Sequence, residues 1–159
     1  MPLGTSLAAD VQAVFDGSPA SAHVAATGLA AAYYSYTSTA LFGLSIPVIT
    51  TAMRDAMAAT LEAGLAVPGA PPTIAAAYGN SVNTFWTGVP VAGGSGTGVT
   101  TGCPGAGAAI ATLTAVFANL ANTSATAAAG IAAALATATL TMTATLTLPP
   151  AGPIVYPIS

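Results

Sequence analysis

Few side chains in this sequence could do acid–base, nucleophilic or metal chemistry, and they are far apart. Catalysis requires an acid, a base, a nucleophile or a metal held close together, and metal sites gather several His, Cys, Asp or Glu ligands. Nothing after Glu62 is charged at neutral pH except the terminal carboxylate. The full inventory is His23, Cys103, Arg54, Asp10, Asp16, Asp55 and Glu62, without a lysine. We therefore expect no enzyme activity, no cofactor and no metal ion.

Three local patterns allow a chemical and a structural interpretation. The run Gly93–Gly98 resembles a phosphate-binding loop, but it lacks the following lysine and the strand–loop–helix context, which favours a flexible or assembly loop. The cluster Tyr33, Tyr34 and Tyr36 could stack on a sugar or a base, although such spacing on a helix more often buries one ring. Cys103 has no nearby cation to stabilise a thiolate and is expected to be inert.

The composition limits the possible partners. The 159 residues are 3% charged, with a calculated pI near 4.2, whereas a typical soluble domain is ~25% charged. One arginine cannot form a basic patch, so nucleic-acid binding is not expected. The mean hydropathy of +0.78 comes largely from alanine, and we predict no membrane span. A surface with so little charge is prone to association, which indicates burial between subunits.

Helical periodicity accounts for most of the chain. We predict helices at 5–16, 20–39, 46–65 (with Ser45 as the N-cap), 73–86, 108–120 and 124–136. Residues 1–137 would form a helical domain with a glycine-rich arm at 88–107, and residues 138–159 a C-terminal strand and an apolar tail. The sequences of residues 28–33 and 73–78 are alike, which we interpret as chance in an alanine-rich chain, and we predict no regular repeat of the solenoid kind.

Residues 138–148 alternate between apolar residues and threonine, the period of a β-strand. Because no second strand of this quality is evident, its unpaired edges indicate pairing with another chain. The sequence therefore predicts a mainly α fold of five or six helices, with one C-terminal strand that pairs between subunits. The expected assembly residues are Leu140, Met142, Thr143, Leu146, Leu148 and Trp86.

The alanine-rich amphipathic helices, the segment Phe85-Trp86-Thr87-Gly88 before a glycine-rich arm, and the threonine-alternating strand resemble small virion structural proteins of tailed bacteriophages and related contractile injection systems. The resemblance implies a non-enzymatic structural subunit of a symmetric assembly: a tail, neck or capsid component, located in the virion after assembly in the host cytoplasm. Its partners would be copies of itself and other structural proteins of the particle.

An alternative rests on Trp86-Thr87-Gly88, which resembles the Trp-X-Gly turn of the WXG100 and PE/PPE class. That resemblance implies a secreted or surface helical protein that binds a partner.

Overall fold

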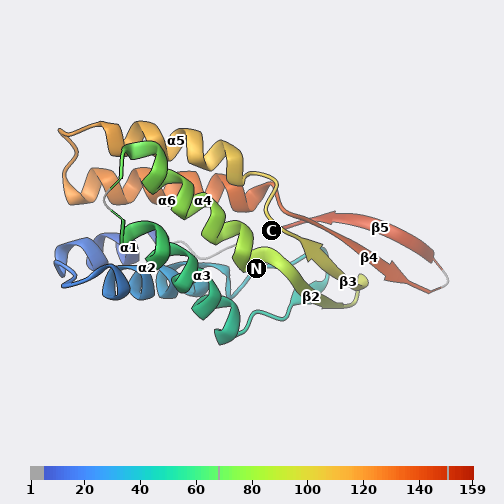
Figure 1. The fold of residues 1–159 in the computed structure, drawn as a ribbon. Helices are drawn as coiled ribbons and strands as arrows, with labels where there is room; N and C mark the ends of the chain where they lie inside the picture. Colours follow the sequence, from blue (N-terminus) through green and yellow to red (C-terminus); the bar gives the residue numbers. More distant parts are fainter. Residues whose placement is uncertain (1–5, 68, 150) are drawn as a thin grey trace.

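The computed structural model describes residues 6–67, 69–149 and 151–159, and in them helices alternate with antiparallel strands (Figure 1). The helices are α1 (Leu7–Asp16), α2 (Ala22–Thr37), α3 (Thr51–Leu65), α4 (Pro71–Trp86), α5 (Ala106–Ala118) and α6 (Ser124–Leu140). The strands are β1 (Ser45–Pro47), β2 (Thr87–Gly93), β3 (Gly96–Thr101), β4 (Thr143–Leu148) and β5 (Ala151–Pro157). The helices gather at one end of the molecule and the strands at the other.

The prediction of a mainly α fold with one intersubunit strand is wrong. The protein is 58% helical and 20% strand, a mixed α/β fold with a five-stranded antiparallel sheet. Strand β4 pairs with β3 on one side and with β5 on the other, so both of its edges find partners in its own chain. The backbone groups that suggested a second subunit are already satisfied.

The strand is also shorter than predicted, because α6 continues through Leu140. The alternation of alanine and threonine at 136–139 is compatible with a helix as well as a strand. In the helix, the Thr139 hydroxyl donates to the carbonyl of Leu135, at 2.8 Å, and Thr139 is fully buried. Helix α6 thus crosses the predicted domain boundary at 137–138.

Two other segments differ from expectation. The glycine-rich segment 88–107 forms most of the β2–β3 hairpin, which is part of the sheet, and then the connection to α5 and its first turn. Ser45–Pro47, predicted as a helix start, forms strand β1 and pairs with β2. The other helix boundaries lie within a few residues of those predicted.

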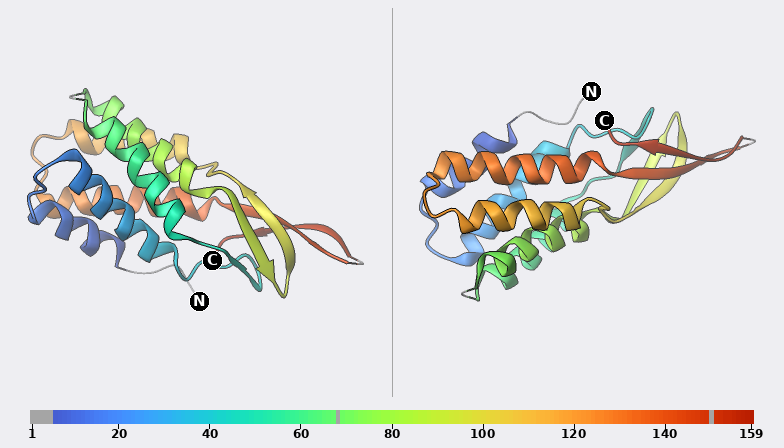
Figure 2. Two further views of the ribbon diagram at one scale, coloured as in Figure 1. Left: turned by 60° about the horizontal axis from the view of Figure 1, so that its bottom comes forward. Right: turned by 90° about the horizontal axis from the view of Figure 1, so that it is seen from above.

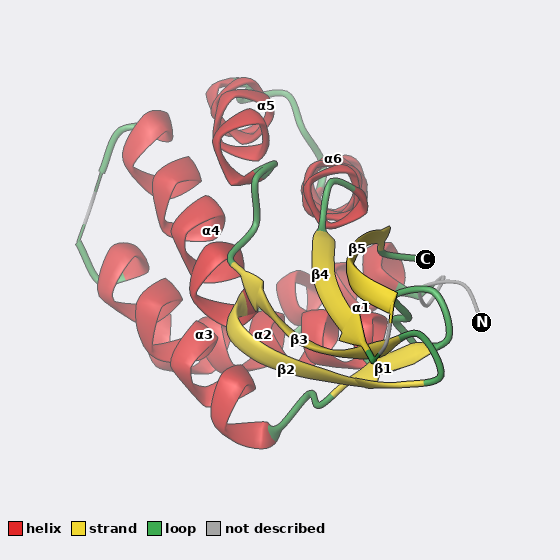
Figure 3. Ribbon diagram, turned by 90° about the vertical axis from the view of Figure 1, so that its right-hand side faces the viewer, coloured by secondary structure: helices red, strands yellow, loops and turns green. Residues whose placement is uncertain are grey.

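The helices form a closed ring. Each packs against its two neighbours in chain order, and α1 packs against α6 to complete the circuit. Figure 3, viewed along the molecule, shows this ring behind the sheet, and Figure 2 shows the helices running side by side toward the strands. The helices follow one another in three pairs along the chain, and the second helix of each pair (α2, α4 and α6) is followed by strands of the sheet.

Helix pairs α1–α2 and α5–α6 are two copies of one unit. A shift of 102 positions carries residues 7–37 onto residues 109–139, and Ala13-Val14-Phe15 onto Ala115-Val116-Phe117. The N-caps Ser21 and Thr123 correspond, and each accepts a bond from the backbone N–H three residues later. The buried residues of α2 are Ala26, Leu29, Ala30, Ala32, Tyr33, Tyr36 and Thr37, and those of α6 are Ala128, Ile131, Ala132, Ala134, Leu135, Ala138 and Thr139. The two sets coincide under the same shift.

Helices α3 and α4 form the remaining unit, which is the middle one in the chain. A shift of 49 positions carries the α2 set onto buried residues of α4, namely Ala75, Tyr78, Gly79, Ser81, Val82, Phe85 and Trp86. Each unit is a helical hairpin followed by a β-hairpin, and the first β-hairpin is reduced to the bridge between Phe42 and Ser45. These units close into a ring and are not a solenoid repeat. The pair of segments that looked alike in sequence, 28–33 and 73–78, is not the pair that corresponds in the structure.

Close helix approach is repeated in all three units. A Cβ placed on Gly28 would lie 2.9 Å from a Val14 methyl, and one on Gly130 would lie 2.8 Å from a Val116 methyl. In the middle unit the glycine is on the first helix, since a Cβ on Gly64 would lie 2.2 Å from the Cβ of Ala77. Small residues allow helices to pack this closely. At each of these contact points there is room for a side chain on only one of the two helices.

The two edges of the sheet are connected into a ring at the end that lies against the helices. Its order is β1-β2-β3-β4-β5. Phe42 bridges to Ser45 on one side and to Ile158 on the other, and Leu41 and Ser159 exchange two backbone hydrogen bonds of 2.9 and 3.0 Å. The first β-hairpin therefore links the two edges of the sheet.

Candidate functional site

Trp86 lies at the centre of the core, where the three units meet. It is fully buried, and its indole N–H donates to the hydroxyl of Tyr33 at 2.8 Å. The Tyr33 hydroxyl also lies 2.5 Å from that of Thr139, so one polar chain connects α4, α2 and α6. The ring of Phe85 packs edge-on against both Tyr33 and Trp86. These contacts make Trp86 a core anchor.

Burial of Tyr33 raises the pKa of its phenol far above the usual value, although its hydrogen bonds to Thr139 and Trp86 act in the opposite direction. The hydroxyl therefore stays protonated at neutral pH and serves as a hydrogen-bonding group. With the indole N–H as its donor and Thr139 as its partner, it is satisfied within the core. Of the three tyrosines considered for stacking on a sugar or a base, Tyr33 and Tyr36 are buried.

The charged side chains are distributed over the surfaces of the helices. His23 Nδ1 lies 2.9 Å from a Glu62 carboxylate oxygen, and this pair between α2 and α3 is largely exposed. Arg54 pairs with its neighbour Asp55 at 2.7 Å. Within the described residues, no group of three His, Cys, Asp or Glu side chains could hold a metal ion.

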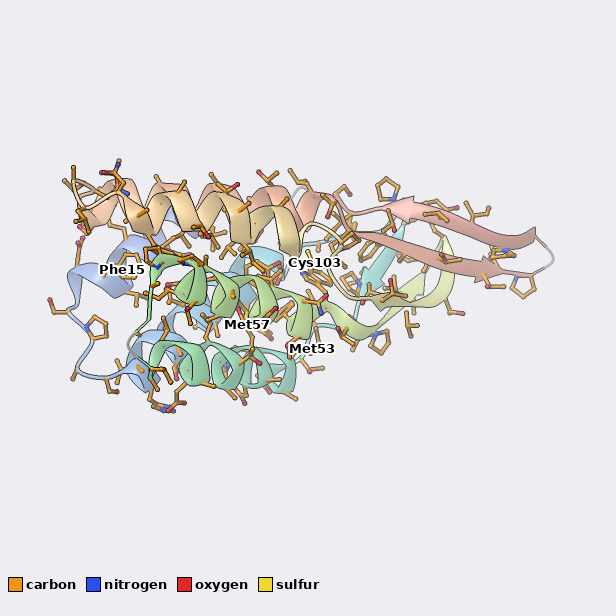
Figure 4. The ribbon with its side chains drawn as sticks, turned by 45° about the horizontal axis from the view of Figure 1, so that its top comes forward. Phe15, Met53, Met57 and Cys103 are labelled. Carbon is orange, nitrogen blue, oxygen red and sulfur yellow. The ribbon has the colours of Figure 1, made fainter. Side chains whose placement is uncertain are left out.

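Cys103 lies between β3 and α5, where the helices meet the sheet (Figure 4). Its thiol is buried and lies 3.3 Å from the carbonyl of Ala138, to which it can donate. Burial raises the pKa of the thiol, against the weaker opposing effect of hydrogen bonds from Gly105, Thr141 and Ala106. A protonated, buried thiol is a poor nucleophile.

Two cavities in the described part of the fold are small and mostly apolar. One, of about 140 Å³, lies between α5 and α6 and is lined by Gly105, Ala108, Ala109, Thr112, Ala133, Ala134, Thr137, Ala138 and Thr141. A second, of about 190 Å³, lies beside the first β-hairpin and is lined by Ser38, Thr39, Ala40, Leu41 and Ile46. Ligand pockets usually measure ~300 Å³ or more and place a few polar groups to orient the ligand. Neither cavity has this character.

The outer face of the sheet is the most distinctive surface of the protein. Side chains at directly paired positions share a face, so Val99, Thr145 and Val155 form one exposed row across β3, β4 and β5. A parallel exposed row contains Ile46, Ala92, Thr97, Thr147 and Pro153. Val99 is 54% exposed, Val155 60% and Ile46 59%, and no strand contains a charged residue. We call these two rows the outer sheet face.

The predicted assembly residues do not form one surface. Trp86, Met142 and Leu146 are fully buried in the core of their own chain. Leu140 is the last residue of α6 and is 60% exposed, while Thr143 and Leu148 are exposed on β4. The structure thus separates three core residues from three surface residues, and contact of any of them with a neighbour remains a prediction.

The free edge of β5 is poorly suited to strand addition. Ile158 donates to the carbonyl of Met142, at 3.0 Å, so the alternating positions Pro153, Val155 and Pro157 direct their backbone away from β4. Proline has no N–H to donate, which leaves Val155 as the outward donor among these three positions. This is a known way of protecting a sheet edge from pairing with another chain.

Comparisons with known proteins place the chain in no group. No family model matches it, and searches of curated proteins and of solved structures found none that is similar. None of the helices in the described residues is sufficiently long and apolar to cross a membrane. The resemblance to phage virion proteins therefore stays a prediction.

Little in the amino-acid sequence indicates the outer sheet face. Ile46 was assigned to a helix start and Val99 to a glycine-rich arm, because their strands are short and interrupted by glycine and proline. Val155 lay in the apolar tail. The available signal was the local alternation Thr97-Gly98-Val99, which is too brief to identify a strand without its partners.

Proposed function

We propose that this protein is a non-enzymatic structural subunit of a symmetric assembly, of the kind found in the tail, neck or capsid of a bacteriophage particle. The observation that carries the proposal is the outer sheet face, an exposed surface of valine, isoleucine, threonine, alanine and proline without any charge. A face of this composition loses little by leaving water and gains from burial of its aliphatic groups.

The chemistry of the interior supports the same proposal. The strongly buried hydroxyl groups are engaged within the fold: Thr37, Ser81 and Thr139 donate to backbone carbonyls of their own helices. In the described residues, no buried side-chain nitrogen or oxygen lacks a hydrogen-bond partner. Active sites often contain polar groups with shifted pKa values in a cleft, whereas the shifted groups here are buried tyrosines and one thiol.

The alternative of a secreted helical partner-binding protein gains no specific support. Trp86-Thr87-Gly88 joins α4 to β2, whereas the Trp-X-Gly turn of the class it resembles connects two helices.

Light scattering coupled to size-exclusion chromatography tests the proposal, with the purified chain at concentrations from 1 to 500 μM (about the range over which weak complexes form). We expect a mass that rises with concentration to a discrete oligomer. A monomer throughout this range would contradict self-assembly.

A further inference from the structure

We propose that the outer sheet face binds the same face of a second copy of this chain, by side-chain packing and without strand addition. The inference rests on the proposed function and deepens it, because it names the surface and the partner. Three observations carry it: the distribution of charge, the protected edge of β5, and the exposed aliphatic rows themselves.

Charge favours a second copy over a charged partner. The chain carries a formal charge of −3, and the side chains that make up this charge lie on α1 and α3. Two copies in contact through their sheets would desolvate no charged side chain and bring no like-charged side chains together, whereas contacts between these helices would bring carboxylates together. A charged ligand would find no complementary group on the outer sheet face.

The edge of β5 determines the type of contact. Because Pro153 and Pro157 lack outward N–H groups, a neighbouring strand could not extend the sheet by a regular ladder. Contact with a neighbour would therefore be made mainly by side chains, with Val99 and Val155 flanking Thr145 in a single row. Packing of two such faces resembles a β-sandwich, in which sheets lie about 10 Å apart.

Comparison of the three units shows why this end of the molecule is left uncovered. The tip of the β2–β3 hairpin is held by the first unit: Leu44 donates its N–H to Ser95 Oγ at 2.7 Å, and the Ser95 N–H bonds to Ser45 Oγ at 3.1 Å. Among the described residues, the β4–β5 hairpin makes no hydrogen bond of this kind at its tip, and it projects past the rest of the sheet (Figures 1 and 2). Its exposed Val155 is therefore accessible to a second molecule.

The area predicts a weak complex. Six residues per strand at ~3.4 Å and five strands at ~4.8 Å give a face of at most roughly 490 Å² per copy. A standard interface buries ~800 Å² per partner, and smaller ones are usually transient. We therefore expect a dimer with a dissociation constant in about the micromolar range. Its affinity should be maintained or increase as NaCl is raised from about 50 to 500 mM, because salt screens the repulsion between two acidic chains.

Sedimentation equilibrium of charge-introducing variants tests the surface. Val155→Lys and Val99→Lys each place an ammonium group within the proposed contact, and we expect each to weaken dimerisation by at least about tenfold. The matched control is Val24→Lys, which makes the same change at a 51% exposed valine of α2 and should leave the dimer unchanged. Circular dichroism establishes that every variant is folded.

A cross-linking experiment gives an independent readout. Val155→Cys should form an intermolecular disulfide under mild oxidation, whereas Leu120→Cys, at a loop residue that is 97% exposed, should not. The native Cys103 is buried and should not compete.

The outcomes distinguish the two proposals. A wild-type monomer at all concentrations would overturn both. A wild-type dimer that Val155→Lys and Val99→Lys leave intact, or that Val24→Lys disrupts equally, would overturn the assignment of the outer sheet face while leaving self-assembly in place. Weakening of the dimer by salt would also contradict the uncharged contact.

Discussion

Replacing Gly64 by alanine tests whether the close helix approach seen in each unit limits the stability of the fold. The new Cβ would lie 2.2 Å from the Cβ of Ala77 and 3.3 Å from its Cα, where ordinary contacts begin at 3.4 Å. Helices α3 and α4 must separate by about 1 Å to accept it. Overpacking of this kind costs up to ~3 kcal/mol, offset by up to ~1 kcal/mol of improved helix propensity. We expect Gly64→Ala to lower the free energy of unfolding by about 2 kcal/mol.

The structure also predicts how the defect is repaired. Ala77→Gly alone should cost about 2 kcal/mol, from lost helix propensity and one buried methyl group. In the double variant the propensity changes cancel and the methyl group moves from α4 to α3. Its stability should therefore lie within about 1 kcal/mol of the wild type, which amounts to a coupling of about 3 kcal/mol between the two sites.

Urea unfolding of the wild type, both single variants and the double variant completes the cycle. Gly107→Ala is the control, because a Cβ there meets no atom within 4 Å, and it should be neutral or slightly stabilising. Additive effects in the double variant, or a Gly64→Ala protein as stable as the control, would refute the argument that each unit has room for only one side chain at this crossing.

Three further predictions follow from the core, the sheet edge and the buried protons. Tyr33→Phe leaves the indole N–H of Trp86 buried without its acceptor, so urea unfolding should show a loss of about 1–3 kcal/mol. Pro153→Ala combined with Pro157→Ala restores two outward N–H groups on β5, and this variant should form thioflavin-positive aggregates that the wild type does not. Burial raises the pKa of Cys103 and of the buried tyrosines, so the folded state holds these protons more tightly than the unfolded chain. The free energy of unfolding should therefore keep the full contribution of these groups below about pH 9 and fall as the pH rises beyond it.

Controls for these three experiments are available in the same chain. Tyr34→Phe, on the same helix as Tyr33, should change stability little, and an equal loss there would argue against the Trp86 contact. A double proline variant that stays clear in solution would show that the edge is protected by other means. Stability that rises between pH 9 and 11 would contradict the direction assigned to the buried groups.

The helices could be predicted because their apolar residues recur at helical spacing, and four of the six begin and end within two residues of the expected positions. The end of α6 could not be predicted, because alanine and threonine in alternation at 136–139 satisfy both periods. The choice between helix and strand depends on Thr139, whose hydroxyl bonds to the carbonyl of Leu135 in the helix. The same hydroxyl contacts the hydroxyl of Tyr33, which is 106 positions away in the chain.

The strands β2 and β3 were missed for a different reason. Close packing of the sheet requires small residues there: a Cβ on Gly98 would lie 2.2 Å from the carbonyl oxygen of Thr145. The glycines that make this pairing possible are the same residues that make the segment look irregular in sequence. The repeat was missed because its correspondence is in burial and spacing, with Tyr33, Val82 and Leu135 at equivalent positions.

The contact between α1 and α6 bears on how the chain folds as it is made. A ribosome releases α1 well over a hundred residues before α6, and local hairpins can form in that interval while the circuit stays open. The decisive step is the meeting of the earliest and latest helices, a distant closure of the kind that slows folding. Until then the apolar side of α1 is exposed to the cell, so a protein that ends as a closed ring must pass through a stage in which chaperones would recognise it.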